Sequence, residues 1–513
     1  MAALAAPSGS SEMPWGTVLL AGLVLALSNF MVVLDITIAN VSVPHIAGGL
    51  GISPSEGTWV ITSYAVAEAI CVPLTGWLAK RFGEVRVFVG GLVGFALFSF
   101  LCGTAPSLGA LVAFRIGQGL AGGPIMPISQ TLLLRIFPKD KHAMAMGIWS
   151  MTTITAPIFG PILGGTISDN WGWNWIFFIN VPIGVACSFA AVALLRRAES
   201  ATERMRVDMV GLTLLVTAVA ALQIMLDLGR ERDWFGSPLI VTLAVIAAIG
   251  FAFLIVWELF EREPIVDLKV FRHSGFTFSV LALVFTYGVF FATLVIIPQW
   301  LQSQLGYTAT WAGYAMAWNG VAAVFMAPVA AILSQKIDPR ILVSGGILWL
   351  AITSLIRVVW WTTGADFWTL ALPQLIQGAG MPFFFVPLTT LALGAVEESE
   401  VASAAGVMNF LRTMSGAVAT AIGVTMWENG AQAARDTFTG VLNGTGTTMQ
   451  TLQAKGLSVE QSRQFVSQLV DSQAIAVTTI NLFELFAAIF IVAAAIIWFA
   501  PKPKHAVSLD AGH

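Results

Sequence analysis

Three ionisable side chains, Asp35, Glu68 and Arg115, lie inside long apolar stretches of this chain. An ionisable group in such surroundings is costly and usually serves a function. A nearby cation favours the charged form of a carboxyl group, whereas burial favours its neutral form. A carboxyl group held between these two effects takes up or releases a proton after a modest change in its surroundings. These residue types therefore predict reversible proton binding, and the alternative is a permanent ion pair that fixes the register of two helices.

The stretches that hold these residues are long enough to cross a lipid bilayer. The chain has 513 residues, of which 57% are hydrophobic and only 10% are charged, whereas soluble domains average about 25% charged residues. Apolar runs of about 18 or more residues recur from end to end, and each predicts a membrane-spanning helix. We count about 14 such spans, at 15–44, 56–79, 86–104, 107–134, 142–167, 175–195, 208–228, 238–260, 275–302, 310–334, 341–361, 368–394, 398–427 and 472–499. The pattern predicts an all-α polytopic membrane protein.

The distribution of lysine and arginine between the loops predicts the orientation. With the N-terminus inside, the inner loops and the C-terminal tail hold roughly 17 of these residues and the outer loops roughly 5. Cytoplasmic loops are the ones enriched in positive charge. Both termini are therefore expected in the cytoplasm, and residues 1–14, which lack any basic residue, do not resemble a cleavable signal.

Weak internal repeats indicate two related halves. Three pairs of segments resemble each other at nearly constant offsets of 252, 255 and 259: Thr58-Trp59 with Thr310-Trp311, Lys80-Arg81-Phe82 with Gln335-Lys336-Ile337, and Arg115-x-x-Gln118-Gly119 with Gln374-x-x-Gln377-Gly378. Each offset spans eight helices, which predicts two six-helix bundles with two helices inserted between them. We expect a tail at 1–14, a bundle at 15–200, inserted helices at 201–274, a second bundle at 275–500 with a long polar outer loop at 428–471, and a tail at 501–513.

The depths of the three ionisable residues match. Asp35 and Arg115 each lie eight or nine residues from the outer end of their spans, roughly 12–14 Å below the outer surface at the rise of an α-helix. Glu68 lies a few ångströms deeper, near the middle of span 56–79. We therefore expect the three groups around one cavity of the first bundle. Gln374 is neutral where its counterpart Arg115 is charged, so the first half is expected to keep the proton chemistry.

The second half offers a smaller set of charges and many aromatic residues. Arg412 and Glu484 lie near mid-membrane in different spans, and we expect a structural ion pair between them. Arg357 and Asp227 lie close to outer span ends and are expected to reach the headgroups. The candidate substrate-binding residues, which combine aromatic rings with neutral hydrogen-bonding groups on inward faces, are Asn319, Gln374, Gln377, Phe291 and Phe384.

Glycine and proline are concentrated in one span. Gly160, Pro161, Gly164 and Gly165 fall within span 142–167 and predict a bent helix with a flat face free of side chains. One interpretation is a close-packed contact between two helices, and the other is a seam along which the two bundles move.

The loop between the second and third spans combines glycine with charge. Gly76, Arg81, Gly83 and Arg86 predict a tight turn whose cations interact with neighbouring helix ends and hold the bundles together on the inner side. The outer loop 428–471 is polar with a helical piece at 459–470, and we expect it to bind another subunit.

Several function classes are disfavoured. The cysteines Cys71, Cys102 and Cys187 lie in apolar segments, and no two histidines stand at metal-ligand spacing, so neither a disulfide framework nor a metal site is expected. No cluster of nucleophiles and bases shares one depth, which disfavours an embedded enzyme, and no cofactor or nucleic-acid partner is expected. A receptor or scaffold would not need the acid–base set of the first bundle.

Several motifs together resemble a known family. The turn Gly76–Arg86, the run Arg115-Ile-Gly-Gln-Gly and the segment Gly160-Pro161-Ile-Leu-Gly164-Gly165 are similar to signature motifs of drug:proton antiporters of the major facilitator superfamily. The segments Leu34–Pro44 and Trp173–Gly184 resemble its 14-helix branch, and the whole chain resembles EmrB-type exporters most. One departure is that Lys80 stands where the family turn has an acid and Glu84 where it has a base.

The resemblance implies proton-driven export of hydrophobic and amphipathic toxic compounds across the bacterial inner membrane. It also implies an EmrA-like periplasmic adaptor and a TolC-like outer-membrane channel as partners. Asp35 and Arg115 would be the coupling residues, and Gly160-Pro161 the antiporter motif. A proton-coupled exporter of one specific metabolite or siderophore is the alternative.

Overall fold

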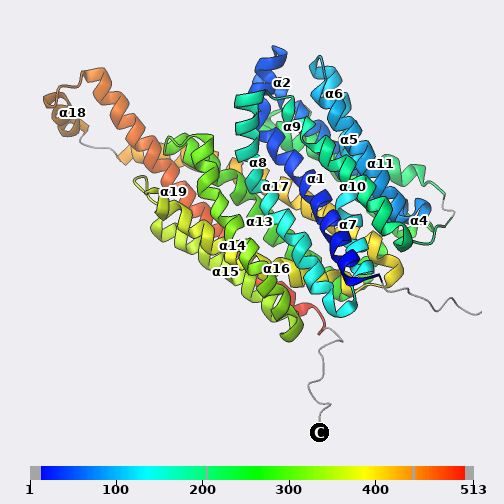
Figure 1. The fold of residues 1–513 in the computed structure, drawn as a ribbon. Coiled ribbons are helices and arrows are strands. Elements are labelled where there is room, and N and C mark those ends of the chain that lie inside the picture. Colours follow the sequence, from blue (N-terminus) through cyan, green and yellow to red (C-terminus); the bar gives the residue numbers. More distant parts are fainter. Residues whose placement is uncertain (1–12, 204–205, 442–444, 503–513) are drawn as a thin grey trace, which may run out of the picture.

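The computed structural model describes residues 13–203, 206–441 and 445–502, and in these residues all regular elements are helices (Figure 1). The first group of packed helices runs from α1 to α10. Its members are α1 (Trp15–Leu50), α2 (Pro54–Gly57), α3 (Trp59–Cys71), α4 (Thr75–Phe82), α5 (Glu84–Gly103), α6 (Leu108–Gly122), α7 (Ile125–Ile136), α8 (His142–Trp171), α9 (Trp175–Phe178) and α10 (Asn180–Leu195). In this group α1 packs on α7, α8 and α10, α3 packs on α6, and α5 packs on α6 and α10.

A second group forms the other half of the molecule. Its members are α13 (Ser274–Gln304), α14 (Ala309–Lys336), α15 (Pro339–Trp360), α16 (Phe367–Gly394), α17 (Val401–Val441), α18 (Thr445–Ala454) and α19 (Val459–Ile496). Here α16 packs on α14 and α15, α13 packs on α17, and α19 packs on α13, α15 and α17. Short 3-10 helices occur at Lys139–Lys141, Arg196–Ala198, Trp234–Gly236, Leu268–Arg272, Glu398–Glu400 and Ile497–Phe499.

The inserted pair consists of α11 (Met209–Gly229) and α12 (Pro238–Phe260). α11 contacts α3 of the first group and α17 of the second, whereas α12 packs on α11. α11 is therefore part of the boundary between the two groups, and α12 covers it from outside.

The predicted all-α polytopic fold is confirmed. Eleven helices of the described chain are long and apolar enough to cross a membrane, or thirteen if each of two bent pairs is one span. One bent pair is α3 and α4, which meet at 58° around Pro73, and the other bends by 45° within α8 between Pro157 and Phe159. The remaining predicted span, 107–134, consists of α6 and α7, because Gly123 and Pro124 interrupt the helix between them.

The segment 428–471 differs from the expected loop. The predicted helical piece at 459–470 is present as the start of α19, but α17 also continues to Val441 and α18 follows it. Arg435 Nε lies 2.7 Å from Asp471 Oδ1 and joins α17 to α19. These helices project beyond the bundles as an arm, at the upper left of Figure 1. We call the residues 428–471 the arm.

The start of α1 and the last described residues after α19 lie on one side of the molecule, at the bottom of Figure 1. We call this side the terminal side and the opposite one, where the arm projects, the distal side. The two groups of helices meet mainly where α8 packs on α14 and α16 and where α4 and α7 pack on α17.

Candidate functional site

A buried ion pair joins α1 to α6. Arg115 Nη1 lies 2.5 Å from Asp35 Oδ2, and the two side chains are 0% and 1% exposed. Arg115 Nε also donates to the carbonyl oxygen of Val60, at 3.0 Å, in α3. Its guanidinium lies over the ring of Tyr64, 4.1 Å from the centroid. The structure thus brings together two of the three predicted acid–base residues.

Neutral side chains complete the surroundings of the Asp35 carboxylate. Gln118 Nε2 and Asn180 Nδ2 donate to Asp35 Oδ1 at 3.0 and 2.7 Å. Gln118 also accepts from Arg115 at 2.8 Å, and Asn180 donates to Ser99 Oγ at 3.2 Å. Three donors from two other helices therefore hold the carboxylate in place, as charge-assisted hydrogen bonds do. Gln118 belongs to the run Arg115-Ile-Gly-Gln-Gly and Asn180 to the segment Trp173–Gly184, but the motifs did not predict that either donates to Asp35.

A cavity of about 440 Å³ lies between the two groups of helices. Its lining residues come from α1, α3, α7, α8, α11, α13 and α17. Thr58 and Arg230, at distal helix ends, mark its mouth, whereas Glu68, Met126 and Arg412 lie near the middle of their spans. The cavity therefore opens toward the distal side.

Glu68 lines this cavity and Asp35 does not. Glu68 is 5% exposed, and no hydrogen bond or ion pair of its carboxylate is found among the described residues. The three acid–base residues thus do not form one cluster: the Asp35–Arg115 pair is sealed between helices, and Glu68 faces the cavity.

Arg412 reaches the same cavity from α17. It is 2% exposed, and its Nη2 group contacts the sulfur of Met126 across the boundary between the groups. The rings of Trp149, Tyr287 and Phe385 lie 5.2–5.9 Å from its guanidinium carbon, in the range of cation–π interactions. The predicted pair with Glu484 is wrong, because Glu484 is exposed on the outer face of α19.

Only one of the five predicted substrate-binding residues lines the cavity, and that residue is Phe291. Gln374 and Gln377 instead accept hydrogen bonds from Arg357 Nη2, the first at 3.1 Å. Asn319 is fully buried, and its amide has no partner in the described residues. Phe384 is 0% exposed and packs against Phe385.

The expectation that Arg357 and Asp227 reach the headgroups is also wrong. Arg357 is 1% exposed because the two glutamines and the rings of Trp361 and Phe483 enclose it. Asp227 instead lines the cavity from α11, beside Gln223. The inserted pair therefore contributes a carboxylate to the cavity wall.

The glycine-rich face of α8 packs on α1. A Cβ atom at Gly160 would lie 2.5 Å from Thr37 Cβ, and one at Gly164 would lie 3.0 Å from the carbonyl oxygen of Ile38. Gly165 has no neighbour within 4 Å of that position. α8 does contact the second group through α14, but Gly160 and Gly164 form a seam within the first group. Pro161 lies inside the same helix.

Close contacts across the boundary seal the terminal side. Asn409 Nδ2 of α17 donates to Gln130 Oε1 of α7 at 2.5 Å. A Cβ atom at Gly76 in α4 would lie 2.7 Å from Ser403 Cα in α17, so the two helices approach as closely as glycine permits. The cavity is thus closed on the terminal side and open on the distal side.

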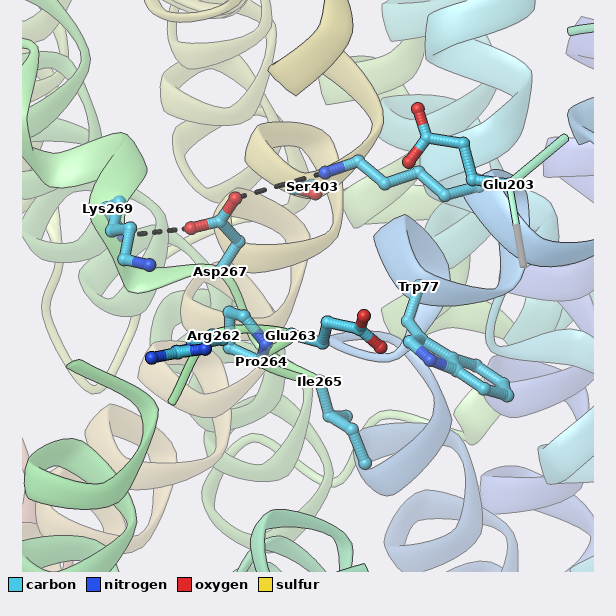
Figure 2. Close-up of a pocket in the computed structure, with 10 residues that line it drawn as sticks. Trp77, Glu203, Arg262, Glu263, Pro264, Ile265, Asp267, Lys269 and Ser403 are labelled. Atoms are coloured by element: carbon cyan, nitrogen blue, oxygen red, sulfur yellow. Dashed lines mark hydrogen bonds and ion pairs between the residues drawn. The ribbon is translucent and has the colours of Figure 1, made fainter. Parts of the chain in front are cut away.

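The segment that follows α12 contacts α4 on this closed terminal side (Figure 2). Lys80 Nζ lies 4.0 Å from Asp267 Oδ2, at a small pocket that Trp77 and Ser403 also line. Asp267 further accepts from the backbone nitrogen of Lys269 at 3.2 Å. Lys80 stands where the family turn carries an acid. Here the acid is Asp267, which faces Lys80 from the segment that follows α12.

The remaining charges of the turn have their own partners. Glu84 Oε1 lies 2.8 Å from Arg135 Nη2, and Arg86 Nε lies 3.7 Å from Glu199 Oε2. Arg81 lies over the ring of Trp77, 5.4 Å from its centroid. Gly83 has a φ of 92°, a conformation that glycine adopts without strain.

One group of the described residues has metal-ligand chemistry. His273, Glu397 and Glu400 place ligand atoms within 4.8 Å of one another. Arg272 already lies 3.0 Å from both glutamates, so the arrangement is that of an ion-pair cluster.

The fold and the paired charges in its first half are those of a membrane transporter. The family model described as Major Facilitator Superfamily matches residues 25–420, and the chain belongs to this superfamily. Among solved structures, the proton:xylose symporter XylE matches with a TM-score of 0.59 and 13% identity, covering 95% of this chain and 96% of that one. At that identity the match supports the fold alone.

Curated relatives define the branch. Multidrug export protein EmrB of Escherichia coli K12 is 45% identical, over 93% of this chain and 94% of that protein. Fatty acid resistance protein FarB of Neisseria gonorrhoeae is 41% identical, over 97% of this chain and 98% of that protein. The chain is an EmrB-type multidrug exporter of the superfamily.

Proposed function

We propose that this protein exports hydrophobic and amphipathic toxic compounds from the cytoplasm in exchange for protons. In this proposal it spans the bacterial inner membrane with the terminal side in the cytoplasm, as the lysine and arginine bias indicates. The two bundles at 15–200 and 275–500 alternate between a state open to the distal side and one open to the terminal side.

The observation that best supports proton coupling is the different placement of two carboxyl groups: Glu68 lines the cavity, and Asp35 is paired with Arg115. Glu68 faces the open cavity, where it can exchange a proton with water. Asp35 forms a buried ion pair with Arg115, and neither residue lines the cavity. Protonation of Glu68 would change the charge that Arg412 and Arg115 experience, so it would favour one arrangement of the two bundles over the other.

The cavity suits amphipathic compounds. Tyr287, Phe291 and Val295 form an apolar side, while Glu68 and Arg412 offer opposite charges at its base. The relative named for fatty acid resistance supports substrates that combine an apolar chain with a carboxylate. Arg412 is the group that would bind such a carboxylate.

The proposed partners are a periplasmic adaptor and an outer-membrane channel. The arm projects on the distal side and exposes Phe465 and Leu469, two apolar residues one helical turn apart. An exposed apolar ridge on an otherwise polar arm favours protein binding.

The test uses purified protein in liposomes that have an acidic lumen and contain a pH-sensitive dye. Adding a lipophilic cation or a weak acid outside should trigger proton efflux in the wild type. Glu68→Gln should lower this efflux at least about tenfold, because the neutral amide cannot carry the proton. The exposed Glu460→Gln in the arm is the matched control and should behave as wild type. Absence of proton movement in the wild type with every compound would reject the antiport mechanism.

The ion pair between Lys80 and Asp267 should make a small contribution to closure. Both side chains are partly exposed, at 30% and 18%, and such pairs contribute about 0.2–1 kcal/mol. We expect Lys80→Glu to lower the transport rate about two- to threefold. The charge-swapped variant Lys80→Glu/Asp267→Lys should recover most of the rate in the same assay. A swapped variant no better than Lys80→Glu would mean that the pair does not act through its charges.

A further inference from the structure

One face of α19 is exposed along the full depth of the second bundle. The residues on it are separated by alternating steps of four and three, and all are exposed: Val477, Asn481, Glu484, Ala488, Ile491 and Ala495. The opposite face packs against α13, α15 and α17 through Leu482, Phe483, Phe486 and Phe490. We call the six exposed residues the α19 face.

The α19 face is polar where lipid would surround it. Glu484 lies near the middle of the predicted span 472–499, and Asn481 lies one turn toward the distal side. Within the described residues neither side chain makes a hydrogen bond or an ion pair. Ionisable residues inside membranes normally face a bundle interior or pair with another group. An unpaired carboxyl group facing lipid therefore points to a partner outside this chain.

The spacing indicates the shape of that partner. Positions that repeat every 3.5 residues form the contact line of a left-handed pair of helices. Ala488 and Ala495 are seven residues apart on this line, and small residues let a second membrane helix approach closely. Toward the distal side the line ends at Val477, because its next position, Ala474, is buried.

The charge decides between two kinds of partner. A second copy of this chain would bring a second Glu484 to the same depth, and like charges in a low dielectric repel strongly. A helix that carries a lysine or arginine at this depth would neutralise Glu484, and Asn481 would supply a further hydrogen bond.

We propose that the α19 face binds a single membrane-spanning helix of a partner protein, with a basic residue beside Glu484. The proposal rests on the proposed function insofar as the partner is the adaptor of the export machinery.

The experiment tests whether the α19 face prefers a membrane-spanning helix that carries a lysine. Full-length protein with Ala488→Cys is reconstituted in liposomes with a synthetic leucine-rich helix of membrane-spanning length. The peptide has a central lysine and two cysteines, one four residues before the lysine and one four residues after it. The matched peptide has leucine in place of the lysine. Oxidative cross-linking is measured on a gel; the native cysteines Cys71, Cys102 and Cys187 are all buried.

We expect at least a fivefold higher yield with the lysine peptide, and loss of this difference when Glu484→Leu is added. A cysteine at Phe253, a 63% exposed residue of α12, should show no preference. Equal yields from both peptides at Ala488→Cys would overturn the proposal, as would a peptide-independent disulfide between two copies, which would assign the face to self-association.

Drug-triggered proton efflux is measured in the same liposomes, so the two proposals can fail separately. Absent efflux with a preserved lysine preference rejects the exporter mechanism but not the binding face. Normal efflux without any lysine preference rejects the binding face alone.

Discussion

Replacing Asp35 by asparagine is expected to abolish drug-triggered proton movement, with a loss of at least about 100-fold in rate, or about 2.7 kcal/mol at tenfold per 1.36 kcal/mol. The carboxylate balances the charge of Arg115, which is 0% exposed. Asparagine keeps the size of the side chain but removes the charge. The amide NH2 group would face either Arg115, which donates to Oδ2, or Gln118 and Asn180, which both donate to Oδ1, so in either orientation at least one donor would lose its acceptor.

Loss of transport alone would not separate coupling from stability. Removing one partner of a buried ion pair costs about 3–5 kcal/mol, because the other charge remains buried and unpaired. The thermal stability of Asp35→Asn should therefore fall as well. Stability is measured by size-exclusion chromatography after heating, and proton flux in liposomes.

The double variant Asp35→Asn/Arg115→Gln separates the two effects. Glutamine is the residue that the second half of the chain has at the position matching Arg115, where Gln374 stands. Because the double variant has no unpaired charge, we expect it to recover most of the lost stability. Proton flux should remain absent. A double variant with near wild-type flux would show that the pair is only structural.

The common depth of Asp35 and Arg115 could be predicted from sequence. A helix rises 1.5 Å per residue, so counting from the span ends places both groups at one level. Depth did not show that Glu68 lies apart from the pair at the cavity, nor that Gln118 and Asn180 donate to Asp35. The spans themselves were predictable, since their apolar length is set by the thickness of the bilayer.

The face that each residue presents could not be predicted in the same way. Membrane helices that are apolar all round lack the polar stripe that marks the outer face of a helix in water. Depth alone therefore could not show that Gln374 and Gln377 turn toward Arg357, nor that Arg412 faces the cavity and Glu484 the lipid. In the arm only the helical piece at 459–470 was predicted; the continuation of α17 to Val441 and the helix α18 were missed, because these residues are polar and show no apolar run.

The second large effect is expected at Gly76, where α4 meets α17. A Cβ atom there would lie 2.7 Å from the backbone Cα of Ser403, and backbone cannot move aside as a flexible side chain can. We expect Gly76→Val to keep the terminal side from closing and to lower the transport rate at least about tenfold, or about 1.4 kcal/mol. Whether the variant still folds and inserts is measured by its yield and its elution in size-exclusion chromatography.

Labelling of a cysteine in the cavity measures the change of state. With Met126→Cys as the reporter, a membrane-impermeant maleimide should react from the distal side in the wild-type background. In Gly76→Val it should react from the terminal side several times faster than in the wild type. Gly90→Val is the control, since no atom lies within 4 Å of a Cβ at that position of α5, and it should label and transport normally. Lost transport with an unchanged labelling pattern would mean that Gly76 acts in some other way than by closure. The contrast between two glycines in neighbouring helices thus tests whether contact between the bundles, and not helix flexibility, closes the terminal side.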